Sequence, residues 1–280
     1  GAVSVTDVEG ALFLFTDTAG AQQVAAKLDA TVAITIPDVA FTGTFGVAIN
    51  TSRSDVDISL DIGAEVIDLV VPEGPFLKVT GTGVTLTILD QTIGGTFSIT
   101  RQTDAVTGAS LLTIAITDGF LTLGGTPALV DVSAVNGAFI VTDSGLAAVL
   151  EATVALSLPS ANLSGSFALE INTTTEAVDQ TIDTVVVDLP AGPYLRLSVT
   201  GLDVSIAGQT LTGDFAVQEQ TQSDGSTKTS VAVANASINL GDGAVVVTNG
   251  TGFFLITAAG LAGSLAATVA IDPALGVTFT

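Results

Sequence analysis

Apolar and polar residues alternate along most of this chain with a period of two rather than 3.6. Between positions 41 and 50, the odd positions carry Phe, Gly, Phe, Val and Ile, and the even ones carry Thr, Thr, Gly, Ala and Asn. Such alternation predicts a β-strand with one buried face and one wetter face. Helix should be nearly absent, and we expect a strand or bulge rather than a helix even at Ala21–Ala30, because related segments run directly into strand-like Ala-Thr-Val-Ala sequences.

A strand motif of the form apolar-x-Gly-x-Phe-x-apolar recurs along the chain. Glycine within a strand is unfavourable unless another group must approach the backbone closely, so we expect a bulky neighbour beside each of these glycines. Polar segments rich in Gly, Asp and Ser separate the strands and predict hairpin turns. The motif occurs as FTGTFGVAI from Phe41, TIGGTFSI from Thr92, LSGSFALEI from Leu163, LTGDFAVQ from Leu211 and a truncated LGVTF ending at Phe279.

Longer internal repeats organise these strands. The 28 residues that begin at Pro72 align without a gap with those that begin at Pro190, 118 positions later. The sequence Ala-Thr-Val-Ala occurs at Ala30, Ala152 and Ala267. Self-similarity at a long period is the signature of a repeat architecture. We predict a first supra-repeat over 1–124, a second over 125–242 and a partial third over 243–280.

The predicted fold class is all-β, an elongated tandem-repeat array of antiparallel strands arranged as a serial β-sandwich or a β-solenoid. One repeat cannot cover its own apolar face, so neighbouring repeats must pack on one another. The first and last strands would present unpaired edges, which invite pairing with another chain. The expected partners are therefore other copies of this chain or adjacent repeats.

Composition and charge exclude several classes of function. The 280 residues include 28 acidic and only 6 basic ones, and the formal net charge is −22. Phosphate binding needs clustered Lys and Arg, so neither nucleic acid nor an anionic membrane surface is an expected partner. No stretch is apolar enough for a membrane-spanning helix. The absence of Cys, Met and Trp suits an oxidising, extracellular setting, although compositional bias of a repetitive sequence explains it equally well.

The only candidate metal ligands are Asp55, Asp57 and Asp61, which cluster directly after a predicted hairpin loop. Calcium prefers several oxygen ligands, and Asp-x-Asp in a loop can supply them. Glu176, Asp179 and Asp183 stand in the matching region of the second repeat. The alternative is that these aspartates only cap turns and keep the loops soluble. Calcium is thus a candidate ligand, and no other cofactor is expected.

No enzymatic activity is expected, and no catalytic residue is predicted. The chain has neither His nor Cys, so imidazole bases and thiolate nucleophiles are missing. Lys78 and Arg196 occupy the same position of two repeats, which favours a structural role. Five asparagines begin Asn-x-Ser/Thr sequences and are candidates for surface glycosylation in a secreted protein. They are Asn50, Asn162, Asn172, Asn235 and Asn249.

The Ala-Thr-Val-Ala, Gly-x-Phe and Pro-x-Gly-Pro-(Phe/Tyr)-Leu segments resemble tandem modules of very large secreted or surface proteins of bacteria, of adhesin-like or filament-like kind. The resemblance implies an extracellular location and a structural or adhesive role. We therefore expect a segment or subunit of a stalk, sheath or filament that assembles through β-strand pairing. The alternative is an adhesin or carbohydrate-binding β-module that recognises glycans, with or without calcium.

Overall fold

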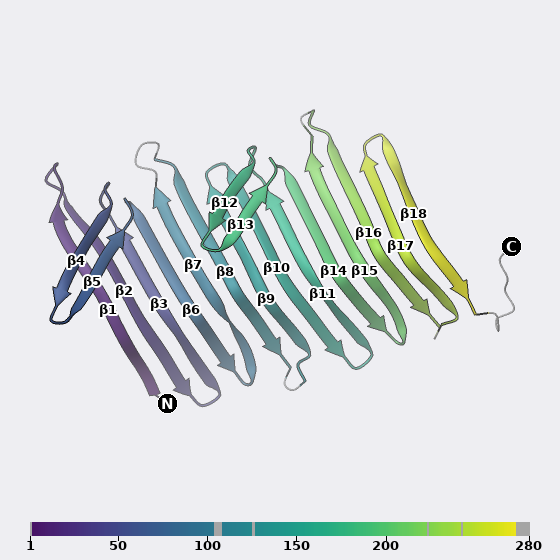
Figure 1. Ribbon diagram of the computed structural model, residues 1–280, viewed down its shortest axis with the longest axis horizontal. Helices are drawn as coiled ribbons and strands as arrows, with labels where there is room; N and C mark the ends of the chain where they lie inside the picture. Colours follow the sequence, from purple (N-terminus) through teal and green to yellow (C-terminus); the bar gives the residue numbers. More distant parts are fainter. Residues whose placement is uncertain (1, 104–107, 125–126, 223, 242, 273–280) are drawn as a thin grey trace. The chain divides into compact units, whose positions relative to one another are not determined.

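A computed structural model describes residues 2–103, 108–124, 127–222, 224–241 and 243–272, and within these ranges every regular element is a β-strand. The predicted all-β array is confirmed, and its strands belong mostly to one long sheet (Figure 1). At Ala21–Ala30, where we expected a strand or bulge in place of a helix, the residues from Gln22 onward are in strand β2. The predicted motif ending at Phe279 lies outside the described residues.

Fourteen strands form the main sheet, in the order β1-β2-β3-β6-β7-β8-β9-β10-β11-β14-β15-β16-β17-β18. Neighbours in this order are consecutive along the chain except where a hairpin intervenes, so each connection is short. The strands are β1 (Ala2–Thr16), β2 (Gln22–Ile36), β3 (Val39–Asn50), β6 (Phe76–Ile88), β7 (Gln91–Thr103), β8 (Ser110–Leu123), β9 (Val130–Thr142), β10 (Gly145–Leu158), β11 (Ala161–Asn172), β14 (Tyr194–Ile206), β15 (Gln209–Thr221), β16 (Thr227–Leu240), β17 (Val245–Thr257) and β18 (Gly260–Ile271).

Two shorter hairpins leave the main sheet at equivalent points of the repeats. The first consists of β4 (Val56–Ile62) and β5 (Glu65–Val71), and the second of β12 (Val178–Ile182) and β13 (Val185–Leu189). The first hairpin packs on β1, β2 and β3. Its Leu69 and Val71 are buried together with Ala25 and Phe76 of the sheet. Because these sheet residues share one face, the hairpin covers that face alone.

Two compact units make up the chain, and their residue ranges interleave. The first contains residues 1–120, 136–146 and 180–186, and the second contains 121–135, 147–179 and 187–280. In the first unit, β1, β2, β3, β6 and β7 pair antiparallel. In the second, the pairing runs from β11 through β14 and β15 to β18. The supra-repeat limits derived from the sequence stay a prediction.

Close approach to a motif glycine, as expected, occurs at Gly43 of β3, where a Cβ atom would lie 3.0 Å from the Val84 side chain of β6. Gly81 of β6, which is outside the motif, is crowded as well. A Cβ atom there would overlap the ring of Phe97 on β7, the neighbouring strand. Phe97 belongs to the second copy of the glycine–phenylalanine motif. The ring thus fills the space that a side chain at position 81 would need, which explains glycine within a strand.

Candidate functional site

The register of the strands separates the main sheet into two chemically different faces. On one face of the second unit, Leu169, Leu197, Val217, Val231 and Phe254 pair in succession from β11 to β17. The adjacent positions on the other face carry Glu170, Arg196, Gln218 and Ser230, again in register. We call the first surface the apolar face and the second the polar face, and both hairpins leave the sheet on the polar face.

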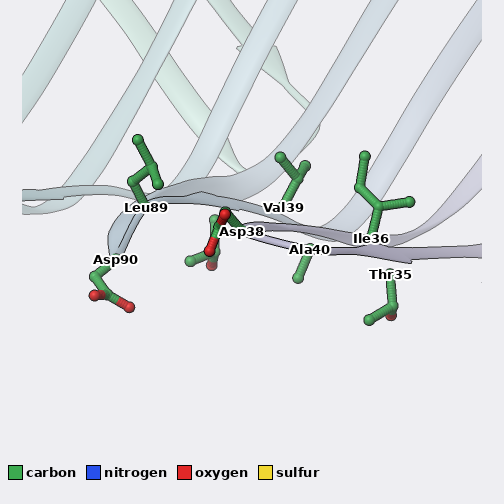
Figure 2. A pocket seen from close by; sticks show the side chains of 8 residues that line it. Thr35, Ile36, Asp38, Val39, Ala40, Leu89 and Asp90 are labelled. Atoms are coloured by element: carbon green, nitrogen blue, oxygen red, sulfur yellow. The ribbon is translucent and has the colours of Figure 1, made fainter. Parts of the chain in front are cut away.

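The first unit shows the same separation. On the apolar face, Leu28, Val47, Val79 and Ile99 pair in succession across four strands. Figure 2 shows the separation at the turns of this unit, where Ile36, Val39 and Leu89 point to one side and Thr35, Ala40 and Asp90 to the other. The depression drawn there has a volume of about 330 Å³ and opens widely to solvent.

The face that the sequence pattern predicts to be buried is largely open. Val47 is 41% exposed, and Leu28 and Leu197 are each 51% exposed. The opposite face, expected to be the wetter one, contains the fully buried Asn50. The alternation of residues was therefore interpreted correctly, but the assignment of burial was wrong. The reason is that the hairpins cover part of the polar face, whereas no described element covers the apolar one.

Asn50 and Asn172 hold the bases of the two hairpins by identical contacts. Asn50 Nδ2 donates hydrogen bonds to the carbonyl oxygens of Ser54, at 2.8 Å, and Pro72, at 2.7 Å. Its Oδ1 accepts from the backbone nitrogen and the hydroxyl of Ser52, at 2.9 and 2.8 Å. Every hydrogen-bonding group of this buried amide is therefore in use. We call this arrangement the asparagine clamp.

The second asparagine clamp repeats the first with the same distances. Asn172 Nδ2 donates to the carbonyl oxygens of Glu176 and Pro190, and Oδ1 accepts from the backbone and hydroxyl of Thr174. Glycine is required next to each clamp, because a Cβ on Gly74 or Gly192 would overlap the carbonyl oxygen of the asparagine. The sequence reasoning missed this role, although the recurrence of Ile-Asn-Thr and of Pro-x-Gly-Pro in both repeats carried the signal.

The clamps make two of the predicted glycosylation asparagines inaccessible. Asn50 and Asn172 are completely buried, and Nδ2, the atom that a glycan would modify, donates both of its hydrogens. Both are therefore unsuitable as surface acceptors in the folded chain. Asn162, Asn235 and Asn249 lie on the surface. Asn235 Nδ2 donates to Asp214 at 2.7 Å, but the pair is exposed.

The structure places the three candidate calcium ligands on the first hairpin but gives them different environments. Asp55 precedes β4, and its Oδ1 accepts a hydrogen bond of 2.8 Å from the backbone nitrogen of Glu73. Asp57 and Asp61 both lie on the exposed outer side of β4, with one other residue of that side between them. In the described ranges, no group of three acidic side chains has the geometry to hold a metal ion. Calcium binding stays a prediction.

Their counterparts on the second hairpin include an ion pair. Lys78 of β6 donates to Asp183 at the hairpin tip, at 2.9 Å, and Ser98 of β7 donates to the same carboxylate. Partial burial alone would raise the pKa of Asp183, but the hydrogen bonds from Ser98 and Lys78 outweigh it and hold this pKa below its usual value. Asp183 therefore attaches the hairpin tip to the polar face and stays ionised in moderately acidic solution.

Tyr194, the only tyrosine, is buried beside the second clamp. Its hydroxyl donates to Glu170 at 2.7 Å, and Arg196 lies 3.8 Å from the same carboxylate. Burial, and then the hydrogen bond to Glu170, raise the pKa of Tyr194 to about 12. Arg196 and Lys78, at the same repeat position, thus both form ion pairs on the polar face. The ring of Tyr194 is too buried to serve as a stacking platform for a sugar.

Comparison with known proteins adds no identification. The chain matches no family model, no curated protein and no solved structure at a significant level. In the part of the chain that the structure describes, no helix could cross a membrane. Its function must therefore be argued from the two faces, the clamps and the strand edges.

Proposed function

We propose that this chain is an extracellular structural protein, a segment or subunit of a stalk, sheath or filament that assembles through β-strand pairing. The observation that carries the proposal is that, in the part of the chain that the structure describes, the outermost strands of the main sheet each have an edge without a hydrogen-bonded partner. Among the described residues, β1 and β18 each have a hydrogen-bonded neighbour on one side only, so one edge of each is unpaired there. Unpaired edges present rows of backbone donors and acceptors to another strand.

The sequence of β18 makes its edge suited to pairing. β18 corresponds to β2 and β10, because all three carry the same Ala-Thr-Val-Ala segment. One edge of β2 pairs with the strand that follows it, β3, and the same edge of β10 pairs with β11. The edge of β18 that has no partner among the described residues is therefore the edge at which a strand of this kind pairs with a further strand. Unlike β2 and β10, β18 carries no charged residue, and charges are a common protection of sheet edges.

The repeated clamps also favour a structural role. Two sets of four hydrogen bonds, at equivalent positions, serve to hold hairpins in place rather than to bind a substrate. A mechanical element gains from repetition because each unit adds the same stability and the same surface. The acidic composition, with a net charge of −22, would oppose non-specific lateral aggregation in such an assembly.

Electron microscopy of the purified chain, with calcium and then with a chelator, tests the proposal. We expect rods or filaments, and we expect Ala262→Lys with Ala266→Lys on the polar side of β18 to shorten them, because charge on an edge strand disfavours pairing. Thr200→Lys, on the polar face of the interior strand β14, is the matched control. Compact, monodisperse particles of the wild type in both conditions would contradict the filament proposal.

The calcium arm of this experiment also tests the candidate ligands. If calcium stiffens the particles, substitution of Asp57 and Asp61 by Asn should abolish that effect, because amide oxygens carry no charge to attract the ion. Identical particles with calcium and with chelator would remove these residues from consideration as ligands without affecting the proposal of strand pairing.

A further inference from the structure

We propose that the apolar face of the sheet binds the apolar face of a second copy of this chain, so that two copies form a two-layer sandwich. The inference deepens the proposed structural role, because it names a second contact between subunits. It concerns the face of the sheet rather than its edge, so that the two contacts can be tested separately.

The exposed area is the first observation. The chain exposes 16367 Å² of surface, whereas a compact monomer of 27.8 kDa would expose about 11,000 Å². Even two separate compact units of half that mass would expose only about 13,000 Å² by the same scaling. The difference is on the order of 3,000 Å² or more for one chain, so two copies together have enough excess surface for a large obligate interface.

The apolar face itself is large enough for a stable interface. In the second unit, register-paired rows of mostly apolar residues cross seven strands from β10 to β18, interrupted only at a few positions such as Glu219, Thr229, Gly252 and Gly263. With about 4.8 Å between strands and about 6.7 Å between successive residues on one face, four rows cover roughly 900 Å². A stable interface needs about 800 Å² on each partner, and exposed apolar patches on monomers rarely exceed about 600 Å².

The occupant should be a similar sheet rather than a helix or an ion. The apolar face is a broad surface that carries Leu, Val, Ile and Phe side chains of neighbouring strands, and stacked sheets pack such faces about 10 Å apart. The same surface occurs in both units, so every copy of the chain offers the complementary partner. Face-to-face packing would also bury the phenylalanines of the recurring strand motif, which the alternation of residues predicts to be inside.

Charge complementarity indicates how the two copies meet. Among register-paired residues of β1–β3, β6, β7, β10, β11 and β14–β18, only Arg101 and Glu219 place a charge on the apolar face. Both are exposed, and they are 118 positions apart, at the same place in the two repeats. A copy that lays its second unit over the first unit of this chain brings Arg101 to the partner's Glu219.

Sedimentation equilibrium on the edge-blocked chain, which carries Ala262→Lys and Ala266→Lys, isolates this contact from strand pairing. We expect a dimer at micromolar concentration. Leu197→Lys should weaken it about a hundredfold, because each dimer would bury two unpaired ammonium groups. Thr200→Lys on the same strand but on the polar face should leave it unchanged. A monomer, or equal effects of both substitutions, would overturn the proposal.

A charge exchange tests the orientation of the two copies. Glu219→Arg should weaken the dimer about tenfold by placing it against Arg101 of the partner subunit, and the added Arg101→Glu should restore the affinity. Failure of this rescue contradicts the proposed contact. If the edge-blocked chain is instead a monomer that binds phosphatidylcholine vesicles, the apolar face has a lipid occupant and the proposed dimer is wrong. Filaments of the wild type could persist in either case, so failure of the face contact does not imply failure of the strand pairing.

Discussion

Replacement of Asn50 by Ala should release the first hairpin from the sheet while the second hairpin stays in place. The substitution removes four hydrogen bonds and leaves the carbonyl oxygens of Ser54 and Pro72 and the polar groups of Ser52 without this partner. A hydrogen bond of this kind contributes about 1 kcal/mol net. Since some of the released groups can bind water, we expect a loss of about 3 kcal/mol for the attachment of β4 and β5.

Hydrogen exchange followed by mass spectrometry measures this loss locally. A change of about 3 kcal/mol corresponds to roughly a hundredfold faster exchange of the backbone amides of β4 and β5, if they exchange through local opening. The amides of β12 and β13 are the control within the same molecule, because Asn172 is intact. Asn172→Ala should reverse the pattern, and Asn162→Ala, at an exposed position, should change neither hairpin. Unchanged exchange of β4 and β5 in Asn50→Ala, or equal acceleration of both hairpins, would refute the argument.

Three further predictions follow from the side chains of the polar face. Because Tyr194 is the only tyrosine, its phenolate absorbance should report a pKa of about 12, and Glu170→Gln should lower this pKa. The unfolded tyrosine ionises near pH 10, so the folded state should lose stability as the pH rises above about 10. The pKa of Asp183 is lowered in the folded state, so its contribution to stability is present above about pH 4 and is lost as the pH falls through the folded-state pKa. Carboxyl NMR titration should show the lowered pKa. Asp183→Asn should remove this acid sensitivity of the second hairpin. An N-glycosyltransferase given the folded chain should modify Asn249 but not Asn172, whereas it should modify a peptide that contains Asn172; glycopeptide mass spectrometry distinguishes these outcomes.

Much of the candidate surface could be predicted from the alternation of residues. The pattern around Phe41–Ile49 places its apolar side chains on one face, as the register shows. The recurrence 118 positions apart similarly places Lys78 and Arg196 at equivalent positions, and both form ion pairs. These features depend only on strand geometry, because successive side chains of a strand point to opposite faces whatever packs against them.

Side-chain partners that are distant in the sequence could not be predicted in this way. The sequence around Asn50 is that of a glycosylation acceptor, and nothing local distinguishes it from Asn162. Only the return of the chain at Pro72 and Gly74 surrounds Asn50 with carbonyl groups and removes it from water. Likewise, Asp183 meets Lys78 across 105 positions, a contact that follows from where the hairpin tip lies.

The sequence by itself therefore determined the strands, their two-sided chemistry and their repetition, because these follow from the period of two and from local turn residues. The tertiary structure decided which face is covered. The segment between β3 and β6 folds back as a hairpin on the polar face, buries an asparagine there and leaves the apolar face open. Alternation specifies which residues share a face, but burial depends on which other element lies over that face, and that is a property of the folded chain and its partners.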